Sequence, residues 1–363
     1  MREGWTYKKF EDCLVKAPKA KQVQTSQYNT GTKYPIVSQE DTLISGYFDD
    51  DAYLYHIDNP IVVFGDHTRV LKYIDFDFVV GADGVKILIP KEFLNAKLLY
   101  YYLLWYKIPN LGYSRHYKLL KEINIPVPSL SKQQSIVAEL DKINELISLK
   151  KAQLSDLDSL AQSIFYDMFG DYEDDTPLSH FINSLSGGKS LAGNAPCMNK
   201  VLKTGAVTYD CFDGNAVKDL PIDYAPLPEH LLKDGDLLVS RMNTPELVGS
   251  CAYVWKAPVN TYLPDRLWRA TIKHGNNPIY LWFSIIQLKA KEQIRTLASG
   301  TSGSMKNISK PRFLSVKIKN APLSLQQEFA KRIELIEQQK AQISSTIKDL
   351  ETLLASRMQY WFD

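Results

Sequence analysis

Two loops of this chain place side chains that can hydrogen-bond DNA beside small residues. The loop at 112–118 carries Arg115, His116 and Lys118, and a second loop spans 299–307. Arginine and asparagine can pair with guanine and adenine edges, while serine, threonine and lysine mostly bind phosphates. We predict that both loops contact nucleic acid, although the alternative of ordinary solvated loops carries equal weight. The candidates in the second loop are Ser302, Ser304, Lys306 and Asn307.

Two further segments resemble strand-turn-strand elements that hold polar side chains at their turns. The first, at 62–69, ends at Arg69, and the second, at 236–244, contains Arg241 and Asn243. A turn on a rigid scaffold can present such side chains to a DNA groove. Arg69, Arg241 and Asn243 are therefore added to the candidate DNA-binding residues.

Basic residues accumulate around both loops. Residues 91–121 contain six Lys or Arg against one acid, and residues 289–319 contain eight against one. A surface that follows phosphates needs such a local excess. Tyrosines at 100–106 accompany the first cluster, but we expect them to form a buried helix face rather than a platform for stacking bases.

No recognisable catalytic or metal-binding motif accompanies these candidates. Gly188-Lys189-Ser190 lacks the first glycine of a phosphate loop, because position 183 is asparagine, and no G-x-G-x-x-G turn occurs. No Asn-Pro-Pro-aromatic methyltransferase motif is present, and no acid is followed two residues later by lysine. The cysteines form no C-x-x-C pair and the histidines are scattered, so we expect no catalytic residue, no metal site and reduced thiols.

The elements that position these loops are visible as an internal repeat. Residues 131–169 and 324–362 align without a gap at an offset of 193, and each begins with serine followed closely by Gln-Gln. Apolar residues recur in each copy in alternating steps of three and four, with Lys150, Lys340 and Arg357 as interruptions. Heptads sustained in this way are typical of a coiled coil. These three charged side chains either fix the register of the two helices or extend past the seam toward solvent, and we favour the second interpretation.

The repeat divides the chain into four segments. We predict an α+β protein with globular α/β domains at 1–130 and 170–323, each followed by a long helix, at 131–169 and 324–363. A final strand before each helix is predicted at 123–125 and 316–318. The two helices can pair antiparallel and hold the domains apart about a pseudo-twofold axis. At 1.5 Å per residue they would span roughly 58 Å, enough to read two short sites on one duplex.

At this point the sequence resembles the specificity subunits of type I restriction-modification systems over essentially its whole length. The duplicated Pro-x-Leu-Ser-x-Gln-Gln helix entry at 128–134, with its shifted copy ending at Gln327, carries most of the resemblance. The runs at 77–84 and 235–241 add weaker support. The resemblance implies a non-catalytic subunit whose two target-recognition domains read the halves of a split double-stranded DNA target, with the helix pair fixing the gap.

The resemblance also implies partners and cofactors. Two methyltransferase (modification) subunits would bind around the helices, use S-adenosylmethionine and methylate adenine, while restriction (translocase and nuclease) subunits would use ATP and magnesium. None of these cofactors is expected on this chain. Apolar helix residues outside the seam are the expected partner interface: Leu146, Leu149, Leu160 and Phe165.

Composition sets the remaining expectations. The 363 residues are 45% hydrophobic and 23% charged with a net charge of +2, as in ordinary folded domains. No secretory segment and no run of roughly 18 apolar residues is apparent, so we expect a cytoplasmic protein without a membrane anchor. Two alternatives remain open, a coiled-coil scaffold that does not bind DNA and a self-contained DNA-modifying enzyme with an unrecognised active site.

Overall fold

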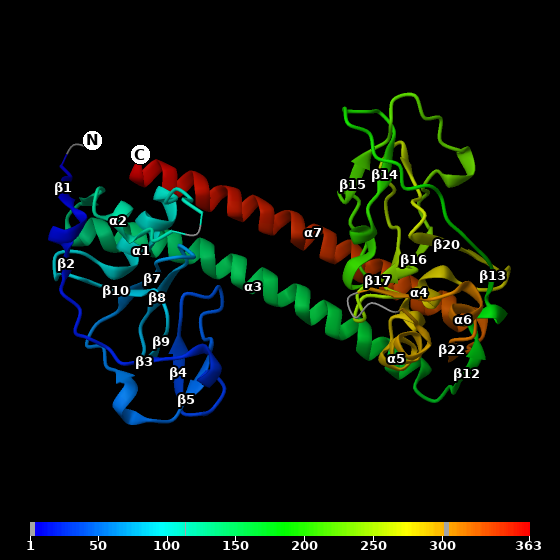
Figure 1. The fold of residues 1–363 in the computed structure, drawn as a ribbon, viewed down its shortest axis with the longest axis horizontal. Coiled ribbons are helices and arrows are strands. Elements are labelled where there is room, and N and C mark those ends of the chain that lie inside the picture. The colour runs from blue at the N-terminus through cyan, green and yellow to red at the C-terminus, as the bar shows by residue number, and fades with distance from the viewer. Residues whose placement is uncertain (1–3, 113, 301–304) are drawn as a thin grey trace. The chain divides into compact units, whose positions relative to one another are not determined.

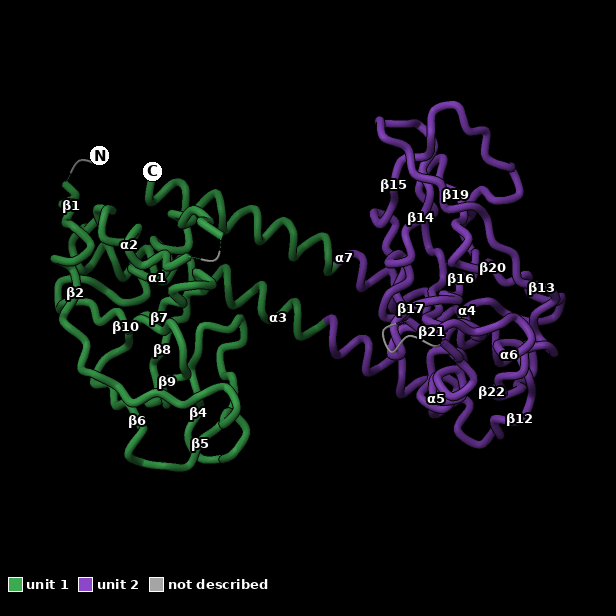
Figure 2. Tube along the Cα trace, viewed as in Figure 1, with its two compact units in different colours: residues 1–153, 343–363 green, residues 154–342 purple. Residues whose placement is uncertain are grey.

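The structure is a computed structural model that describes residues 4–112, 114–300 and 305–363. The chain forms two compact units, unit 1 with residues 1–153 and 343–363 and unit 2 with residues 154–342 (Figure 2). Two long helices, α3 (Leu130–Phe169) and α7 (Leu323–Phe362), each contribute a segment to both units. The predicted α+β class is confirmed. None of the described helices is long and apolar enough to cross a membrane.

Unit 1 is built on a four-stranded sheet in the order β2-β10-β7-β8 (Figure 1). A second sheet has the order β3-β9-β4-β5 with β6 also paired to β9, and β1 pairs with β11. The apolar run Ile61-Val-Val-Phe64 forms β7, which is buried along its whole length at the centre of the first sheet. The elements are β1 (Thr6–Lys9), β2 (Leu14–Val15), β3 (Gln22–Val23), β4 (Tyr34–Val37), β5 (Gly46–Phe48), β6 (Leu54–Tyr55), β7 (Ile61–Gly65), β8 (Leu71–Ile74), β9 (Phe78–Gly81), β10 (Val85–Pro90), α1 (Ala96–Tyr106), α2 (Tyr117–Leu120) and β11 (Asn124–Val127).

Unit 2 repeats this plan with an additional sheet. Its main sheet has the order β13-β20-β16-β18, and β16 is buried along its length as β7 is in unit 1. The pair β12-β22 corresponds to β1-β11, and β15-β14-β19 repeats the antiparallel and parallel pairings of β5-β4-β9. The pair β17-β21 is the addition. The elements are β12 (Asp174–Pro177), β13 (Ile182–Ser186), β14 (Lys200–Leu202), β15 (Val217–Asp219), β16 (Leu237–Ser240), β17 (Met242–Asn243), β18 (Cys251–Tyr253), β19 (Thr261–Tyr262), β20 (Leu267–Ile272), α4 (Pro278–Ile285), α5 (Leu288–Leu297), β21 (Lys306–Asn307), α6 (Lys310–Leu314) and β22 (Lys317–Lys319).

The predicted buried face of the tyrosine-rich helix is confirmed. Tyr101 and Tyr102 of α1 are 2% and 7% exposed. The Tyr101 hydroxyl donates to Asp141, and the Tyr102 hydroxyl donates to the carbonyl of Asn124. Buried phenols need such acceptors, so these tyrosines join α1 to α3 and β11 and do not form a surface for stacking bases.

The repeated Gln-Gln pair has a structural cause that is the same in both units. Gln133 is buried, accepts the amide N–H of Asn95 at 2.7 Å, and donates to the carbonyls of Phe93 and Pro128 at 2.8 and 2.9 Å. Gln326 likewise accepts the N–H of Asn277 and donates to the carbonyl of Ala321. Asn95 and Asn277 in turn cap α1 and α4 through their side chains. One glutamine of each pair therefore joins the start of a long helix to the helix that lies on the sheet.

Within each unit the two long-helix segments run antiparallel. In unit 1, Glu139 of α3 contacts Arg357 of α7, and Lys151, farther along α3, contacts Glu351, earlier on α7. In unit 2, Asp158 pairs with Lys340, and the Phe165 ring lies against Phe329. The seam is buried in both, and Arg357 and Lys340 form ion pairs between the helices. The buried seam residues are Ile136, Leu140, Ile143, Ile147, Ala161, Phe329, Ile333, Ile336, Ile343, Ile347 and Trp361.

The ion pair between Glu139 and Arg357 predicts a pH dependence. The guanidinium of Arg357, together with the Trp361 indole N–H at 3.0 Å, lowers the pKa of the Glu139 carboxyl below its ordinary value. A lowered pKa in the folded state stabilises the protein above the pKa of the unfolded glutamate and stops doing so as the pH falls through the folded pKa. We expect wild type to be more stable than Glu139→Gln at pH 7, and the difference to vanish as the pH falls from about 5 to below 4. Urea unfolding of both proteins across this range measures it, and a difference that is constant with pH would contradict the assignment.

Candidate nucleic-acid interface

The two candidate segments of unit 2 meet at the end of its central strand. The chain leaves β16 at Arg241 and forms β17, which pairs antiparallel with β21. In this register Asn243 lies opposite Lys306, and Met242 lies opposite Asn307. The N–H of Ile308 donates to the carbonyl of Arg241 at 3.0 Å, which fixes the start of the pair. The strand pair, named here the β17–β21 ribbon, thus brings together four candidates that are distant in sequence.

The polar groups of the ribbon are only partly used inside the protein. The Lys306 ammonium donates to the carbonyl of Gly300 at 3.4 Å, and the side-chain oxygen Oδ1 of Asn243 accepts the N–H of Thr244 at 2.9 Å. The Arg241 guanidinium lies 6.0 Å from the centre of the Trp268 ring. Arg241 Nε and Asn307 Oδ1 are buried and have no hydrogen-bond partner among the described residues. Leaving a buried polar atom unpaired costs free energy. The ribbon therefore has hydrogen-bonding groups that no described residue uses.

The two candidate segments of unit 1 meet at the corresponding place. The turn between β7 and β8 contains Arg69 in a left-handed conformation (φ 65°), and its guanidinium donates to the carbonyl of Ile108 at 3.1 Å. The N–H of His116 donates to the carbonyl of Asp66 at 2.8 Å, just as Ile308 does to Arg241. Arg115 and Lys118, on either side of His116, are exposed. Each unit therefore gathers basic side chains where its central strand ends.

His116 itself has a structural role, so its assignment as a DNA contact is wrong. It is 0% exposed; Nδ1 lies 2.9 Å from the Asp66 carbonyl, and Nε2 accepts the N–H of Leu111 at 3.0 Å. These partners place the ring proton on Nδ1. The Asp66 carboxylate also accepts the N–H of Tyr117 at 2.7 Å, at the start of α2. Asp66 was not identified from the sequence; the only local signal is an acid directly after a buried strand.

Ser302 and Ser304 lie outside the described residues. Their assignment as DNA contacts therefore stays a prediction. In the sequence they precede Lys306 by four and two residues.

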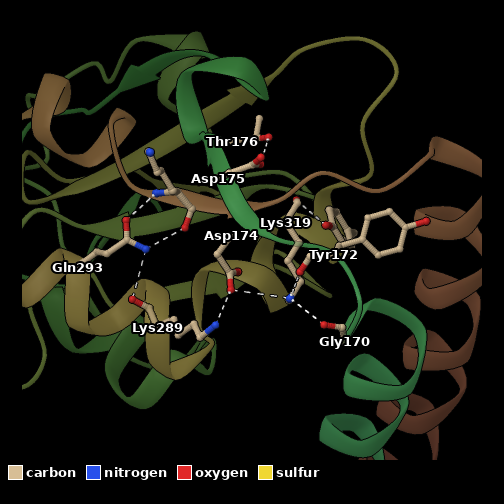
Figure 3. A network of polar contacts seen from close by, with 10 residues as sticks. Gly170, Tyr172, Asp174, Asp175, Thr176, Lys289, Gln293 and Lys319 are labelled. Carbon is tan, nitrogen blue, oxygen red and sulfur yellow. Dashed lines mark hydrogen bonds and ion pairs between the residues drawn. The ribbon is translucent and has the colours of Figure 1, made fainter.

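Several lysines of the basic segment 289–319 are paired inside the protein, so fewer of them can bind phosphates than the residue count indicates. Lys289 and Lys319 both contact the Asp174 carboxylate, at 3.3 and 3.8 Å, and Lys319 donates to the carbonyls of Gly170 and Tyr172 (Figure 3). Lys291 is buried against Asp210. Lys289 and Lys319 hold β12, β22, α5 and the end of α3 together, and Lys291 joins α5 to the segment that contains Asp210. The phosphate-following role predicted for the whole cluster is wrong for the buried Lys291 and for Lys319, whose side chain is 15% exposed. For Lys289, whose side chain is 75% exposed, it stays a prediction.

The proposed partner residues separate into two groups. Leu146, Leu149 and Leu160 are 42%, 59% and 47% exposed, all on α3. Phe165 is 4% exposed and packs against Phe169, Phe283 and Phe329 in the core of unit 2. Its assignment to a partner interface is wrong, because residues of α4 and α7 already cover its ring.

The described residues contain no group of three or more His, Cys, Asp or Glu arranged to hold a metal ion. Gly188-Lys189-Ser190 also forms no phosphate loop: the Ser190 hydroxyl donates to Asp265, and a β-carbon at Gly188 would collide with the carbonyl of Leu263. The chemistry that the arrangement supports is hydrogen bonding and charge complementarity toward a polyanion.

Comparison with known proteins agrees with this geometry. Residues 2–158 match the family described as the type I restriction modification DNA specificity domain. The chain is 25% identical over 236 residues to the type I restriction enzyme EcoKI specificity subunit of Escherichia coli K12, over 58% of this chain and 50% of that protein. It is 21% identical over 337 residues to the Escherichia coli EcoR124I/EcoR124II specificity subunit, over 86% of this chain and 81% of that protein. The chain is thus similar to type I specificity subunits, and residues 2–158 match their DNA specificity domain.

Solved structures agree with this assignment at the level of the fold. The type I restriction-modification S subunit from M. genitalium has a TM-score of 0.62 at 12% identity, with 99% of this chain and 96% of that chain covered. A chain from a structure describing the assembly and conformational transition of a type I system has a TM-score of 0.53 at 15% identity, with 99% and 98% covered. The resemblance seen in the sequence is confirmed. The matched family is a DNA specificity domain, not a catalytic one, and the named relatives are specificity subunits. The match to the EcoKI subunit nevertheless spans only half of that protein's length.

Proposed function

We propose that this chain is a type I specificity subunit and that it reads a bipartite double-stranded DNA target, one half with each unit. The observation that carries the proposal is the convergence, in each unit, of two distant segments with basic side chains at the end of a buried central strand, joined in unit 2 by asparagine side chains. Arg115, Lys118 and Arg69 would contact DNA in unit 1. The β17–β21 ribbon would do so in unit 2, with Asn243 facing a base edge and Lys306 a phosphate.

The chemistry would belong to partner subunits. Two methyltransferase subunits would bind along the long helices, where Leu146, Leu149 and Leu160 are exposed, and restriction subunits would join that complex. S-adenosylmethionine, ATP and magnesium would bind to those partners and not to this chain. The complex would act in the cytoplasm, on adenine methylation and on cleavage of unmodified DNA in host defence.

The test is a methylation map. The chain is co-expressed with the methyltransferase encoded beside it, and adenine methylation is mapped across the host genome by single-molecule sequencing. We expect a two-part motif with a fixed gap, lost when Arg115 or Lys306 is replaced by alanine and changed in one half when one unit is exchanged. A stable complex that methylates nothing, or follows no two-part motif, would contradict the proposal.

The alternative of a scaffold that does not bind DNA makes a different prediction. A scaffold complex would show no DNA affinity that depends on salt. A reader that contacts six to ten phosphates should lose roughly 10³- to 10⁵-fold in affinity between 50 and 200 mM salt. The exposed Arg115 and Lys118 near the end of β7 and the half-buried Arg241 and Lys306 at the end of β16 favour the reader.

A further inference from the structure

Unit 2 contains an aromatic pocket that the proposed DNA contacts do not use. It is a cavity of about 470 Å³, located where α3, α4 and α7 meet the segment 209–212. Tyr253, Trp255 and Trp282 form one wall, with the Trp255 ring edge-on to both neighbours at 4.6 and 6.0 Å. Asp158 and Tyr209, which also line it, are well exposed: the Asp158 side chain is 65% accessible and Tyr209 is 78% exposed.

The charges that line this pocket favour a cation. The Lys340 ammonium lies 2.7 Å from both the Asp158 and the Glu337 carboxylates, so two negative charges share one positive charge. Asp210 is already paired with Lys291 at 2.6 Å. The faces of the aromatic rings add negative potential. A phosphate would be repelled here, whereas an ammonium or guanidinium group would be attracted by rings and carboxylates together.

Unit 1 has an equivalent aromatic corner, and the equivalence is fixed by register. Tyr73 of β8 lies opposite Val62, and Tyr253 of β18 lies opposite Leu237. Val62 lies four residues before Asp66, and Leu237 lies four residues before Arg241. Asp66 and Arg241 occupy matching positions, because their carbonyls accept the equivalent N–H groups of His116 and Ile308. Tyr100 and Trp282 each lie five residues after the asparagine that caps their helix. The Tyr73–Tyr100 and Tyr253–Trp282 ring centres are both 6.4 Å apart.

The corner of unit 1 already contains a cation of its own. The Lys97 ammonium lies 5.0 Å from the centre of the Tyr73 ring and 2.9 Å from the Asp141 carboxylate on α3. Lysine 97 follows the capping asparagine by two residues, and the residue in that position in unit 2 is the buried Ile279. Unit 2 therefore has the aromatic rings without the lysine.

Unit 2 also has a counterpart of the carboxylate. Asp141 corresponds to Glu334 of α7 at the repeat offset of 193 residues. Glu334 lies eight residues after the buried Gln326, as Asp141 lies eight residues after the buried Gln133, so it occupies the matching face of its helix. Burial raises the pKa of the Tyr253 phenol, and the charge of Glu334 raises it further. None of the ion pairs between described residues includes Glu334. Ring and carboxylate are thus both present, and the cation that joins them in unit 1 is missing.

We propose that the pocket of unit 2 accepts an arginine or lysine side chain of the methyltransferase subunit, in the position that Lys97 fills in unit 1. This inference rests on the proposed function, because it takes the methyltransferase as the partner that binds beside the long helices. One methyltransferase contact would then exist at unit 2 and have no counterpart at unit 1, where the chain's own lysine occupies the corner.

The test compares the affinity of full-length variants for the methyltransferase encoded beside this chain, measured by calorimetry. Glu334→Gln and Trp255→Leu should each raise Kd about threefold to thirtyfold, the range expected for a cation bound to an aromatic ring. Trp255→Phe keeps an aromatic face and should stay within about threefold of wild type. Asp349→Asn removes an exposed acid elsewhere on α7 and serves as the control. Thermal unfolding of each variant shows that it folds; if Trp255→Leu does not, the exposed Glu334→Gln decides alone.

Each outcome has a defined meaning. An unchanged Kd for Glu334→Gln overturns the pocket assignment, and if the wild-type complex still methylates a two-part target, the proposed function stands. Normal assembly with weakened DNA binding by the complex would also overturn it, in favour of nucleic acid as the occupant. A wild-type chain that binds no methyltransferase would defeat both proposals.

Discussion

Replacing Gln133 with leucine is expected to lower the free energy of unfolding of unit 1 by about 3–5 kcal/mol. The substitution leaves the amide of Asn95 and the carbonyls of Phe93 and Pro128 buried without their partner. Each unpaired buried group costs about 1–3 kcal/mol. The neighbouring Gln134 is exposed, so Gln134→Leu should change stability by less than about 0.5 kcal/mol.

Urea unfolding followed by circular dichroism measures both substitutions, and unit 2 offers an independent repeat of the experiment. Gln326 is buried and bonded in the same way, while Gln327 is exposed. Gln326→Leu should therefore destabilise unit 2, and Gln327→Leu should not. Equal effects of the buried and the exposed glutamine would mean that the hydrogen bonds to the helix entry do not determine stability.

The features that were predicted correctly are those encoded by local patterns. Both long helices, the strand before each of them and the buried face of α1 follow from periodicity and from proline and serine at fixed positions. The internal repeat added the division into two similar halves. Such signals act over a few turns of helix or a few residues of strand, so a single sequence is enough to find them.

The errors concern residues whose environment is set by distant parts of the chain. His116 has the composition of a DNA-binding loop, but its burial depends on Asp66, 50 residues earlier. Lys319 lies in a basic run, but its partners Tyr172 and Asp174 are about 150 residues away. Phe165 lies outside the heptad seam, and only the fold shows that α4 covers it. None of these contacts is visible in the spacing of neighbouring residues.

The two segments of the candidate site in unit 2 were identified separately, and the sequence did not indicate that they lie side by side. Asn243 and Lys306 were each selected for chemistry, and nothing in the sequence indicated that β17 and β21 pair. A strand pattern specifies which face is buried but does not name the partner strand. The pairing gives the two side chains a common surface and makes their roles separable by experiment.

Asn243→Ala and Lys306→Ala are expected to impair DNA recognition in different ways. An asparagine that pairs with an adenine contributes about 1–3 kcal/mol of discrimination against other bases, or about fivefold to 150-fold. Asn243→Ala should therefore reduce methylation of the wild-type target by such a factor and relax the motif at one position. Lys306→Ala should weaken binding to every sequence alike and reduce the slope of log affinity against log salt by about one.

The methyltransferase complexes of both variants are compared by methylation mapping and by DNA titrations at several salt concentrations. Asn276→Ala, at an amide near the start of α4 and outside the ribbon, is the matched control. If Asn243→Ala lowers methylation equally at all sequences, Asn243 positions the backbone and base reading in unit 2 must come from other residues. If Lys306→Ala changes the motif itself, the lysine contacts a base edge, since a phosphate contact carries no sequence information directly.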